Sequence, residues 1–503
     1  MAGPVFTSDS RPKIDGDAKV TFYVVMCAII SATGGLMFGY DIGISGGVTA
    51  MDDFLEKFFP AVYARKLRTH ENNYCKFNSQ RLQAFTSSLY LAAMVATFLA
   101  AWVCKKYGRR PTMRAASLFF LGGVALTAGA VNLPMLIIGR ILLGLGVGFA
   151  NQAVPLFLSE IAPSKWRGSL NILFQLLITV GISIANLVNY WASSLHPWGW
   201  RLSLGLAGVP AALLCFGSLL IVETPTSLIE RGKSEKGKAT LERIRGTKNV
   251  EPEFQQLVKA CETASEVKHP YHRLMRRDGH PRLFISIILQ VFQQLTGINA
   301  IMFYAPVLFQ TMGFKNDASL LSAVITGLVN VIATFVSIAI VDRVGRKALL
   351  LQAAVQMFIC QGAIGIILLK DLHLTNSLNP TVAIVVVILV CCYVASFAWS
   401  WGPLGWLIPS EIFPLETRSA GFSFAVCSNM LFTFLIAQAF LSMMCHLKAG
   451  IFFFFAGWIL IMGTFVVFFL PETKGVPIDQ MTERVWKKHW LWARFMAEET
   501  NRV

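Results

Sequence analysis

Charged residues are scarce in this chain. Asp, Glu, Lys and Arg make up 14% of its 503 residues and hydrophobic residues 55%, whereas soluble domains carry about 25% charge. The apolar residues come in blocks of about 20, the length that a helix needs to cross the hydrocarbon core of a bilayer. The low charge therefore excludes an ordinary soluble protein and indicates a membrane protein.

Motifs for nucleotides and metals are also missing. The chain has no P-loop, so ATP is not expected to drive it, and no His/Cys cluster has the spacing of a metal site. The glycine-rich "GLGVGF" (Gly144 to Phe149) lies inside an apolar block with no strand before it. No N-x-[ST] acceptor with x other than Pro occurs, so N-glycosylation is not expected. We expect no enzyme, no catalytic residues, no metal and no cofactor.

The net charge of +16 has a one-sided distribution. Most of the 44 Lys and Arg fall on the side of residues 1–20, with the largest share in 223–281. This is the positive-inside bias of a membrane protein, so it does not indicate nucleic acid as a partner. Residues 1–20 carry both charge signs and lack the features of a signal peptide. Both termini are expected in the cytoplasm.

Twelve apolar blocks predict twelve spanning helices, because a spanning segment must satisfy its own backbone hydrogen bonds. The blocks are 21–45, 82–103, 115–133, 135–158, 169–192, 202–222, 283–310, 319–341, 348–369, 382–408, 419–440 and 449–470. The fold class is therefore an all-α membrane protein with the lipid bilayer as its partner.

The chain repeats itself. "LSEIAPSKWRG" (Leu158 to Gly168) and "PSEIFPLETRS" (Pro409 to Ser419) each follow the fourth block of a half, and both read S-E-I-x-P-x-x-x-R. "KKYGRRPTM" (Lys105 to Met113) and "DRVGRKALL" (Asp342 to Leu350) each follow the second. Two motif pairs in matching places indicate duplicated halves, the plan of many secondary transporters.

These motifs, together with "GRILLGLGVG" (Gly139 to Gly148), "QQLTGIN" (Gln293 to Asn299) and "PETKG" (Pro471 to Gly475), resemble the sugar porters of the major facilitator superfamily. "GYDIGISGGV" (Gly39 to Val48) and the long loop after helix 1 look most like plant sugar transport proteins, which are hexose–proton symporters. The chain departs from the pattern at Ala101, Lys105 and Ile338, and in "VETPT" (Val222 to Thr226). These departures affect the details of the cytoplasmic gate.

The resemblance implies a 6+6 major facilitator fold in the plasma membrane. The expected parts are a cytoplasmic N-terminus (1–20), an N-terminal half (21–222) with an extracellular lid (46–81), a helical cytoplasmic linker (223–281), a C-terminal half (282–470) and a cytoplasmic tail (471–503).

Two ionisable groups, Asp41 and Arg140, lie deep within the blocks. Such residues are costly in a bilayer and usually pair and mark a proton or substrate path. A carboxyl beside a guanidinium releases its proton easily, whereas a desolvated carboxyl without that partner holds it. Separating the two would therefore load Asp41 with a proton. The alternative is a structural ion pair. The glycines around Asp41 favour close helix packing, although bending during gating is compatible with them.

A sugar site needs amide side chains and an aromatic plate. Several buried polar residues align with sugar-contacting positions of the resembling family, and Gly402, Pro403 and Gly405 imply a broken helix beside Trp406. Taken singly, each amide could equally join two helices. The expected substrate-binding set is Gln175, Gln293, Gln294, Asn299, Asn330, Asn429, Trp406, Gly402, Phe38 and Ile42.

The repeated motifs predict a cytoplasmic gate of weak surface ion pairs, in which Glu160 and Glu411 face the basic turns at Arg109 and Arg346. The full expected set is Arg109, Glu160, Arg167, Glu223, Arg346, Glu411, Arg418 and Glu472.

Two of the ten cysteines, Cys75 and Cys445, are expected on the extracellular side of the membrane, one in each half. They suggest a disulfide in an oxidising compartment, and the resemblance implies a lid tied to the other half in this way. Two free thiols are the alternative.

The function indicated is proton-coupled symport of glucose-like monosaccharides, with protons as the coupling ion. A facilitative hexose carrier, a polyol or inositol carrier, and a membrane sugar sensor are the alternatives. Asp41 argues against a facilitator, and the short tail argues against a sensor.

Overall fold

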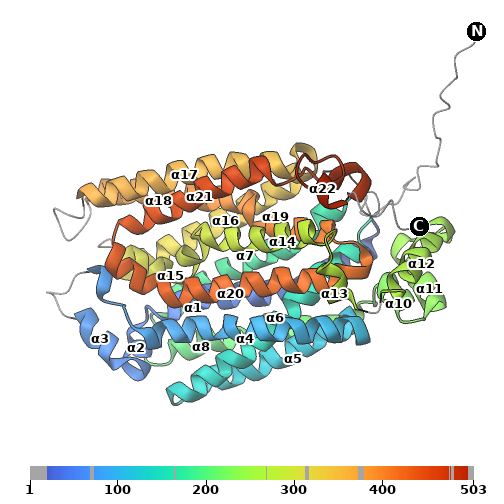
Figure 1. The fold of residues 1–503 in the computed structure, drawn as a ribbon. Helices are drawn as coiled ribbons and strands as arrows, with labels where there is room; N and C mark the ends of the chain where they lie inside the picture. The colour runs from blue at the N-terminus through green and yellow to red at the C-terminus, as the bar shows by residue number, and fades with distance from the viewer. Residues whose placement is uncertain are drawn as a thin grey trace, which may run out of the picture.

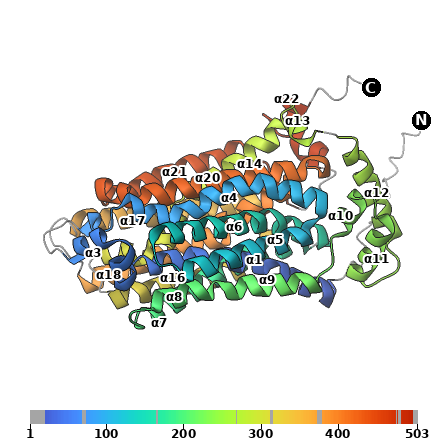
Figure 2. The ribbon, with the colours of Figure 1, turned by 90° about the horizontal axis from the view of Figure 1, so that it is seen from below.

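The computed structural model describes residues 20–67, 73–163, 166–267, 269–311, 316–371, 379–474, 476 and 481–496. Within these ranges it is helical, and long helices run side by side in one bundle (Figure 1). One end of the bundle carries the helices of the 223–281 segment, and we call it the linker end. The opposite end carries α2 and α3, and we call it the lid end (Figures 1 and 2).

The first half contains six spanning segments. They are α1 (Phe22–Val48), α4 (Gln80–Tyr107), α5 (Arg109–Ala128), α6 (Leu133–Ile161), α7 (Arg167–Ala192) and the pair α8 (Gly199–Leu206) and α9 (Gly208–Leu220). Between α1 and α4 lie α2 (Asp52–Phe58), α3 (Pro60–Leu67) and the short η1 (Asn73–Cys75).

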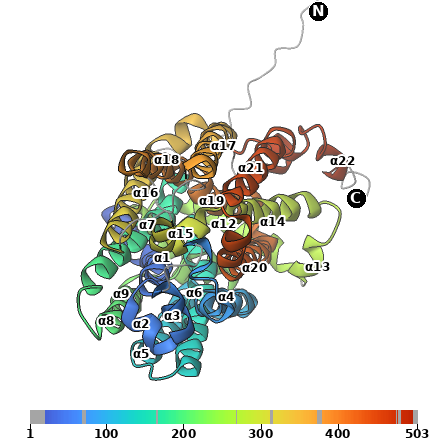
Figure 3. The same cartoon turned by 90° about the vertical axis from the view of Figure 1, so that its left-hand side faces the viewer.

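The second half repeats this plan. Its segments are α14 (His280–Leu295) with α15 (Ile298–Thr311), α16 (Asn316–Val344), α17 (Arg346–Asp371), α18 (Pro380–Trp399) with α19 (Trp401–Ile412), α20 (Leu415–Leu447) and α21 (Gly450–Phe468). The described part of the tail forms η4 (Thr482–Trp486) and α22 (Ala493–Met496). Viewed from the lid end, α1 and α15 lie between helices of the two halves (Figure 3).

The linker forms α10 (Pro225–Glu230), α11 (Ser234–Arg245), α12 (Glu251–Ser265) and α13 (Pro270–Leu274). Ile229, Leu241, Val250, Phe254 and Cys261 enclose a small apolar core there. Burial in this core raises the pKa of the Cys261 thiol to about 12. The amphipathic helices expected from the sequence thus pack their apolar faces against one another.

The repeated G-R-[RK] motif makes the same turn in both halves. Gly108 and Gly345 both have φ of +103°, a conformation that side chains rarely adopt, and each ends one long helix and starts the next. The expected block 115–133 therefore begins earlier, at Arg109. Its first six residues include three arginines, and α5 is not among the eleven segments that are long and apolar enough to be recognised as spans by composition. It lies alongside α6 and α9 as the twelfth.

Two of the spans are broken, as their glycines and prolines predicted. Gly297 has φ of +87° between α14 and α15. The break between α18 and α19 is at Ser400, two residues before Gly402. A free backbone at this depth is tolerated only where protein or a cavity surrounds it, so both breaks identify the bundle interior.

Candidate functional site

Asp41 of α1 and Arg140 of α6 form a fully buried ion pair. Arg140 Nη1 donates to Asp41 Oδ1 at 2.5 Å, with side-chain exposures of 0% for Arg140 and 2% for Asp41. The expected pairing is therefore present. Burial strengthens the attraction of such a pair but makes its separation costly.

Neutral oxygens satisfy the rest of the guanidinium. Arg140 Nε donates to the Phe85 carbonyl at 3.0 Å, and Nη2 donates to Ser45 Oγ at 2.9 Å and to the Thr86 carbonyl at 3.4 Å. Phe85 also presents its ring to the guanidinium, 4.9 Å from the centroid. Arg140 is therefore held in place by contacts that do not depend on Asp41.

Asp41 is less completely bound. Its Oδ2 is buried and has no hydrogen-bond partner among the described residues, and the same holds for the hydroxyl of Tyr90. A buried carboxylate oxygen without a donor is energetically costly, and protonation of that oxygen would remove part of the cost. Asp41 thus has one oxygen committed to Arg140 and one available for a proton.

The glycines of α1 let its neighbours approach closely. A Cβ on Gly39 would meet the Ile178 carbonyl of α7, and one on Gly43 would lie 2.7 Å from Ala185 Cβ. Because α1 is one continuous helix from Phe22 to Val48, these contacts support the packing interpretation over bending.

The expected amide residues meet where the two broken helices face each other. Gln293 Nε2 donates to the carbonyls of Trp401 and Gly402 at 2.9 and 3.0 Å. Asn429 Nδ2 donates to Gln293 Oε1 at 2.7 Å. Gln294 Nε2 lies 3.5 Å from Gln293 Oε1, and Asn299 donates to Gln294. Four expected side chains therefore form one hydrogen-bonded network.

Gln290 completes this network and was missed by the sequence analysis. Its Nε2 donates to the Gly405 carbonyl at 2.5 Å, and its Oε1 accepts from Asn429 Nδ2 at 2.6 Å. Its position three residues before Gln293, on the same helix face, was the available signal.

The remaining expected sugar residues make contacts of other kinds. Gln175 Nε2 would be 3.1 Å from a Cβ on Gly402, and the Trp406 ring packs edge-on against Phe174 at 5.6 Å. Gln175 therefore lies beside Gly402, whose carbonyl accepts from Gln293. Trp406 directly follows Gly405, whose carbonyl accepts from Gln290. Asn330 donates to Met302 Sδ at 3.9 Å.

Phe38 and Ile42 lie on α1 near Asp41. Both are buried on α1, and Phe38 packs against Tyr90 with ring centroids 6.5 Å apart.

Arg109 and Arg346 each form a direct ion pair with the expected acid of their own half. Arg109 Nη2 contacts Glu160 Oε1 at 2.6 Å, and its Nη1 contacts Glu230 at 3.1 Å. In the second half Arg346 Nη2 contacts Glu411 Oε1 at 3.0 Å.

Glu223 and Glu472 occupy equivalent positions in the two halves. Glu223 accepts from the backbone N–H groups of Arg109 and Arg110, and Glu472 accepts from those of Arg346 and Lys347. Each carboxylate therefore caps the first turn of a helix.

The description of these pairs as surface contacts was wrong. The side chains of Arg109 and Glu160 are 5% and 1% exposed, and those of Arg346 and Glu411 are 5% and 10% exposed. Packing of the linker segment explains part of this burial, since Thr224 Oγ1 donates to Glu160 Oε2 at 2.5 Å.

The two other expected gate arginines interact electrostatically with the acid of the opposite half, Arg418 with Glu160 and Arg167 with Glu411. Arg418 Nε also lies 3.5 Å from the Phe413 carbonyl. A hydrogen bond between the halves comes from Ser169 Oγ, which donates to Asp342 Oδ2 at 3.1 Å.

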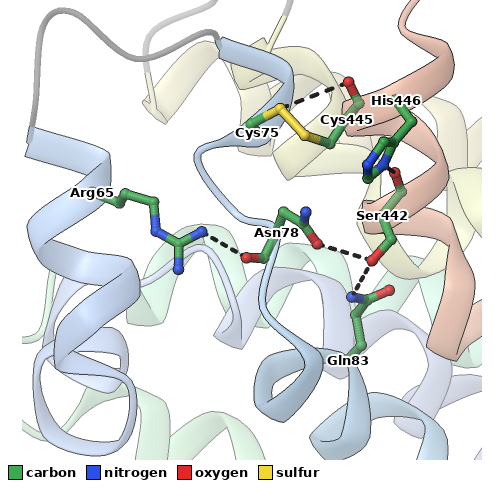
Figure 4. Close-up of a disulfide and its surroundings, with 7 residues drawn as sticks. All are labelled: Arg65, Cys75, Asn78, Gln83, Ser442, Cys445 and His446. Atoms are coloured by element: carbon green, nitrogen blue, oxygen red, sulfur yellow. Dashed lines mark hydrogen bonds between the residues drawn. A yellow bond between two sulfur atoms is a disulfide. The ribbon is translucent and has the colours of Figure 1, made fainter.

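At the lid end, Cys75 and Cys445 form a disulfide that joins η1 to α20 (Figure 4). The predicted bond is therefore confirmed. Beside it, Ser442 Oγ donates to Asn78 Oδ1 at 2.9 Å and accepts from Gln83 Nε2 at 3.2 Å (Figure 4). The segment after α3 is thus attached to the second half covalently and by hydrogen bonds.

Comparison with known proteins identifies the family of this chain. The model of the family described as "Sugar (and other) transporter" matches residues 26–485. The chain belongs to this sugar transporter family. It is therefore a multi-pass membrane transporter and not an enzyme, as expected.

Plant members of the family are very similar over their whole length. Sugar transport protein 8 of Arabidopsis thaliana is 67% identical over 96% of this chain and 95% of its own. Sugar transport protein MST4 of Oryza sativa subsp. japonica is 63% identical over 99% and 96%.

Solved structures of the same fold include a bacterial symporter. The proton:xylose symporter XylE, bound to 6-bromo-6-deoxy-D-glucose, superposes with a TM-score of 0.78 at 26% identity, covering 92% of this chain and 98% of that one. A partially occluded inward-open form of XylE from E. coli gives 0.73 at 26% identity, covering 91% and 100%. The major facilitator fold expected from the sequence is confirmed.

Proposed function

We propose that this sugar transporter carries glucose-like monosaccharides into the cell together with a proton, by alternating access in the plasma membrane, with both termini in the cytoplasm. The observation that carries the proposal is the buried Asp41, with one carboxylate oxygen on Arg140 and the other without a donor among the described residues. The named relatives are sugar transport proteins, and XylE is a proton symporter.

The proton would reach Asp41 when the pair with Arg140 opens. Arg140 keeps three neutral acceptors on the backbone of α4 and on Ser45, so it would not have to follow Asp41. The Asp41 carboxyl, once separated from Arg140 in an apolar setting, would hold a proton. Inward transport of the sugar would then require the protein with Asp41 protonated.

The sugar would bind at the amide network between α14, α19 and α20. Gln293, Gln294, Asn299 and Asn429 bond to one another and to free carbonyls at the helix breaks. These groups can exchange such bonds for sugar hydroxyls, because each amide both donates and accepts. Gln175 lies beside Gly402 and Trp406 follows Gly405, and Trp406 would supply the aromatic plate that a sugar ring packs against.

Coupling between the two sites would pass through α1. Phe38 precedes Asp41 by three residues on α1, and Ile42 follows it directly. The Phe38 ring packs against Tyr90, whose hydroxyl has no partner in the part of the chain that the structure describes. A sugar that displaces Phe38 would therefore alter the surroundings of Asp41.

The deciding experiment is uptake of labelled glucose by a cell that lacks its own hexose transport, with and without a proton uncoupler. Accumulation that the uncoupler abolishes supports symport. Uptake that only equilibrates, unaffected by the uncoupler, would identify a facilitative hexose carrier. Uptake of inositol in preference to glucose would identify a polyol carrier, and binding without uptake would identify a sensor.

A further inference from the structure

Two guanidinium groups converge on one residue near the linker end of the bundle, where α5 and α9 lie side by side (Figures 2 and 3). Arg110 Nε donates to the Ser218 carbonyl at 2.6 Å, and its Nη2 donates to the Leu219 carbonyl at 2.7 Å. Arg114 Nε donates to Ser218 Oγ at 3.2 Å, and its Nη2 lies 3.4 Å from the same Ser218 carbonyl.

No carboxylate among the described residues lies within 4 Å of either guanidinium. Glu223, the acid at this turn, accepts from the backbone N–H groups of Arg109 and Arg110 and lies 3.8 Å from Arg231. The hydrogen bonds of the two guanidinium groups described above therefore all go to neutral oxygens, and Glu223 acts on Arg110 electrostatically without contacting its guanidinium. An anion would relieve the repulsion between the two guanidinium groups.

The surroundings of this arginine pair are apolar and exposed. Leu118, one turn after Arg114, is 61% exposed, and Phe216 and Leu220 on either side of Ser218 are 70% and 67% exposed. In a spanning bundle such residues face lipid tails. The arginine pair thus lies where the polar headgroup of a lipid would continue into its acyl chains.

A comparison with the equivalent turn of the second half shows that Arg110 and Arg114 have different roles. The equivalent turn contains Arg346 and Lys347, and Lys347 Nζ donates to the Val467 carbonyl at 2.7 Å. This contact repeats the bond from Arg110 to the Ser218 carbonyl, and both close the last turn of a helix. Capping of α9 therefore explains Arg110.

Helix capping does not explain Arg114. When the halves are aligned on Arg109 and Arg346, Leu351 occupies the position of Arg114. When they are aligned on Glu223 and Glu472, Val467 occupies the position of Ser218. The duplicated fold therefore forms this turn with two apolar residues. The extra guanidinium and its hydroxyl partner are a feature of the first half alone.

We propose that Arg110 and Arg114 bind the phosphate of an anionic phospholipid in the leaflet at the linker end. A guanidinium binds phosphate through two parallel N–H donors and is weakly hydrated, which suits a site at the membrane interface. The alternative is that Arg114 only extends toward the membrane interface and bonds Ser218. In that case the two positive charges would stay close together with no anion bonded to either guanidinium. The lipid would hold the α5–α9 edge of the first half to the leaflet.

The test is native mass spectrometry of the full chain, purified with phosphatidylcholine and titrated with phosphatidylglycerol. Arg114→Leu with Ser218→Val recreates the arrangement of the second half, which the duplicated fold already tolerates. We expect this variant to bind phosphatidylglycerol about tenfold more weakly than the wild type, equivalent to about 1.4 kcal/mol, and Arg114→Lys to lie between them. Lys236→Gln, at an exposed linker lysine, removes a positive charge elsewhere and should bind as the wild type does.

Equal retention of phosphatidylglycerol by the wild type and the double variant would overturn the proposal. So would displacement of the lipid by millimolar glycerol phosphate, because the site would then bind a free phosphate ester. The thermal unfolding of the wild type provides a second measurement that needs no variant. Phosphatidylglycerol should raise its Tm relative to phosphatidylcholine alone, and an unchanged Tm counts against a specific site.

Discussion

Replacing Asp41 with Asn removes the charge of the buried pair while keeping the shape of the side chain. The amide oxygen can still accept from Arg140 Nη1, which now donates to Asp41 Oδ1 at 2.5 Å. Arg140 also keeps its bonds to Phe85, Ser45 and Thr86. Breaking a buried ion pair costs about 3–5 kcal/mol, and these remaining acceptors place the loss of stability at the lower end, about 3 kcal/mol.

The effect on transport is far larger. If Asp41 carries one proton per sugar, as we propose, each cycle moves one charge. The driving force is then about 2.3 kcal/mol per 100 mV plus about 1.36 kcal/mol per pH unit. At 100 mV and one pH unit this is about 3.7 kcal/mol, which permits accumulation of several hundredfold. Asp41→Asn cannot bind the proton and should reach an accumulation ratio of about one.

The assay is uptake of labelled glucose into proteoliposomes with an imposed pH gradient and potential, at matched protein content. Sugar exchange without a gradient should persist in Asp41→Asn, which separates lost coupling from lost folding. Glu235→Gln, the same chemical change at an exposed linker carboxylate, should accumulate sugar as the wild type does. Accumulation by Asp41→Asn with an intact pH dependence would refute the assignment of Asp41 as the proton carrier.

Three further predictions concern the sugar, the gate and the lid. Gln294→Ala should raise the apparent KM for glucose about tenfold without loss of protein at the cell surface, because removing one partner of a buried hydroxyl costs about 1–3 kcal/mol. Neutralising Glu160 and Glu411 together should favour the inward-open state, seen as greater labelling of cysteines introduced into the inner cavity, since Arg109 and Arg346 lose their buried partners. Cys75→Ala should weaken proton coupling or shift the pH optimum of uptake while leaving KM unchanged, because it releases the lid from α20.

Each of these has a result that contradicts it. An unchanged KM in Gln294→Ala, and also in Gln293→Ala and Asn299→Ala, would remove α14 and α15 from the sugar site. Unaltered labelling in the double gate variant would show that the two acids do not bias the conformation. A Cys75→Ala protein with the wild-type pH profile would limit the disulfide to a structural role.

Much of the fold follows from local properties of the chain. The length of an apolar block decides whether a helix can span, so the spans were readable without tertiary information. The helix breaks near Gly297 and Gly402 were readable too, because glycine and proline act on their own segment of backbone. So were the duplicated motifs and the depth of Asp41 and Arg140, and a charge that deep in a spanning helix needs a partner.

Tertiary structure decided what lies between the helices. No pattern in the sequence places the Phe85 carbonyl at Arg140, because a backbone oxygen has the same chemistry everywhere. Gln290 looked like one more polar residue of a helix, and only the approach of α19 and α20 brings Gly405 and Asn429 to it. The gate pairs looked like exposed ion pairs because each arginine follows a polar turn. The packing of Thr224 and the neighbouring helices buries them, and burial depends on the shape of the assembled fold.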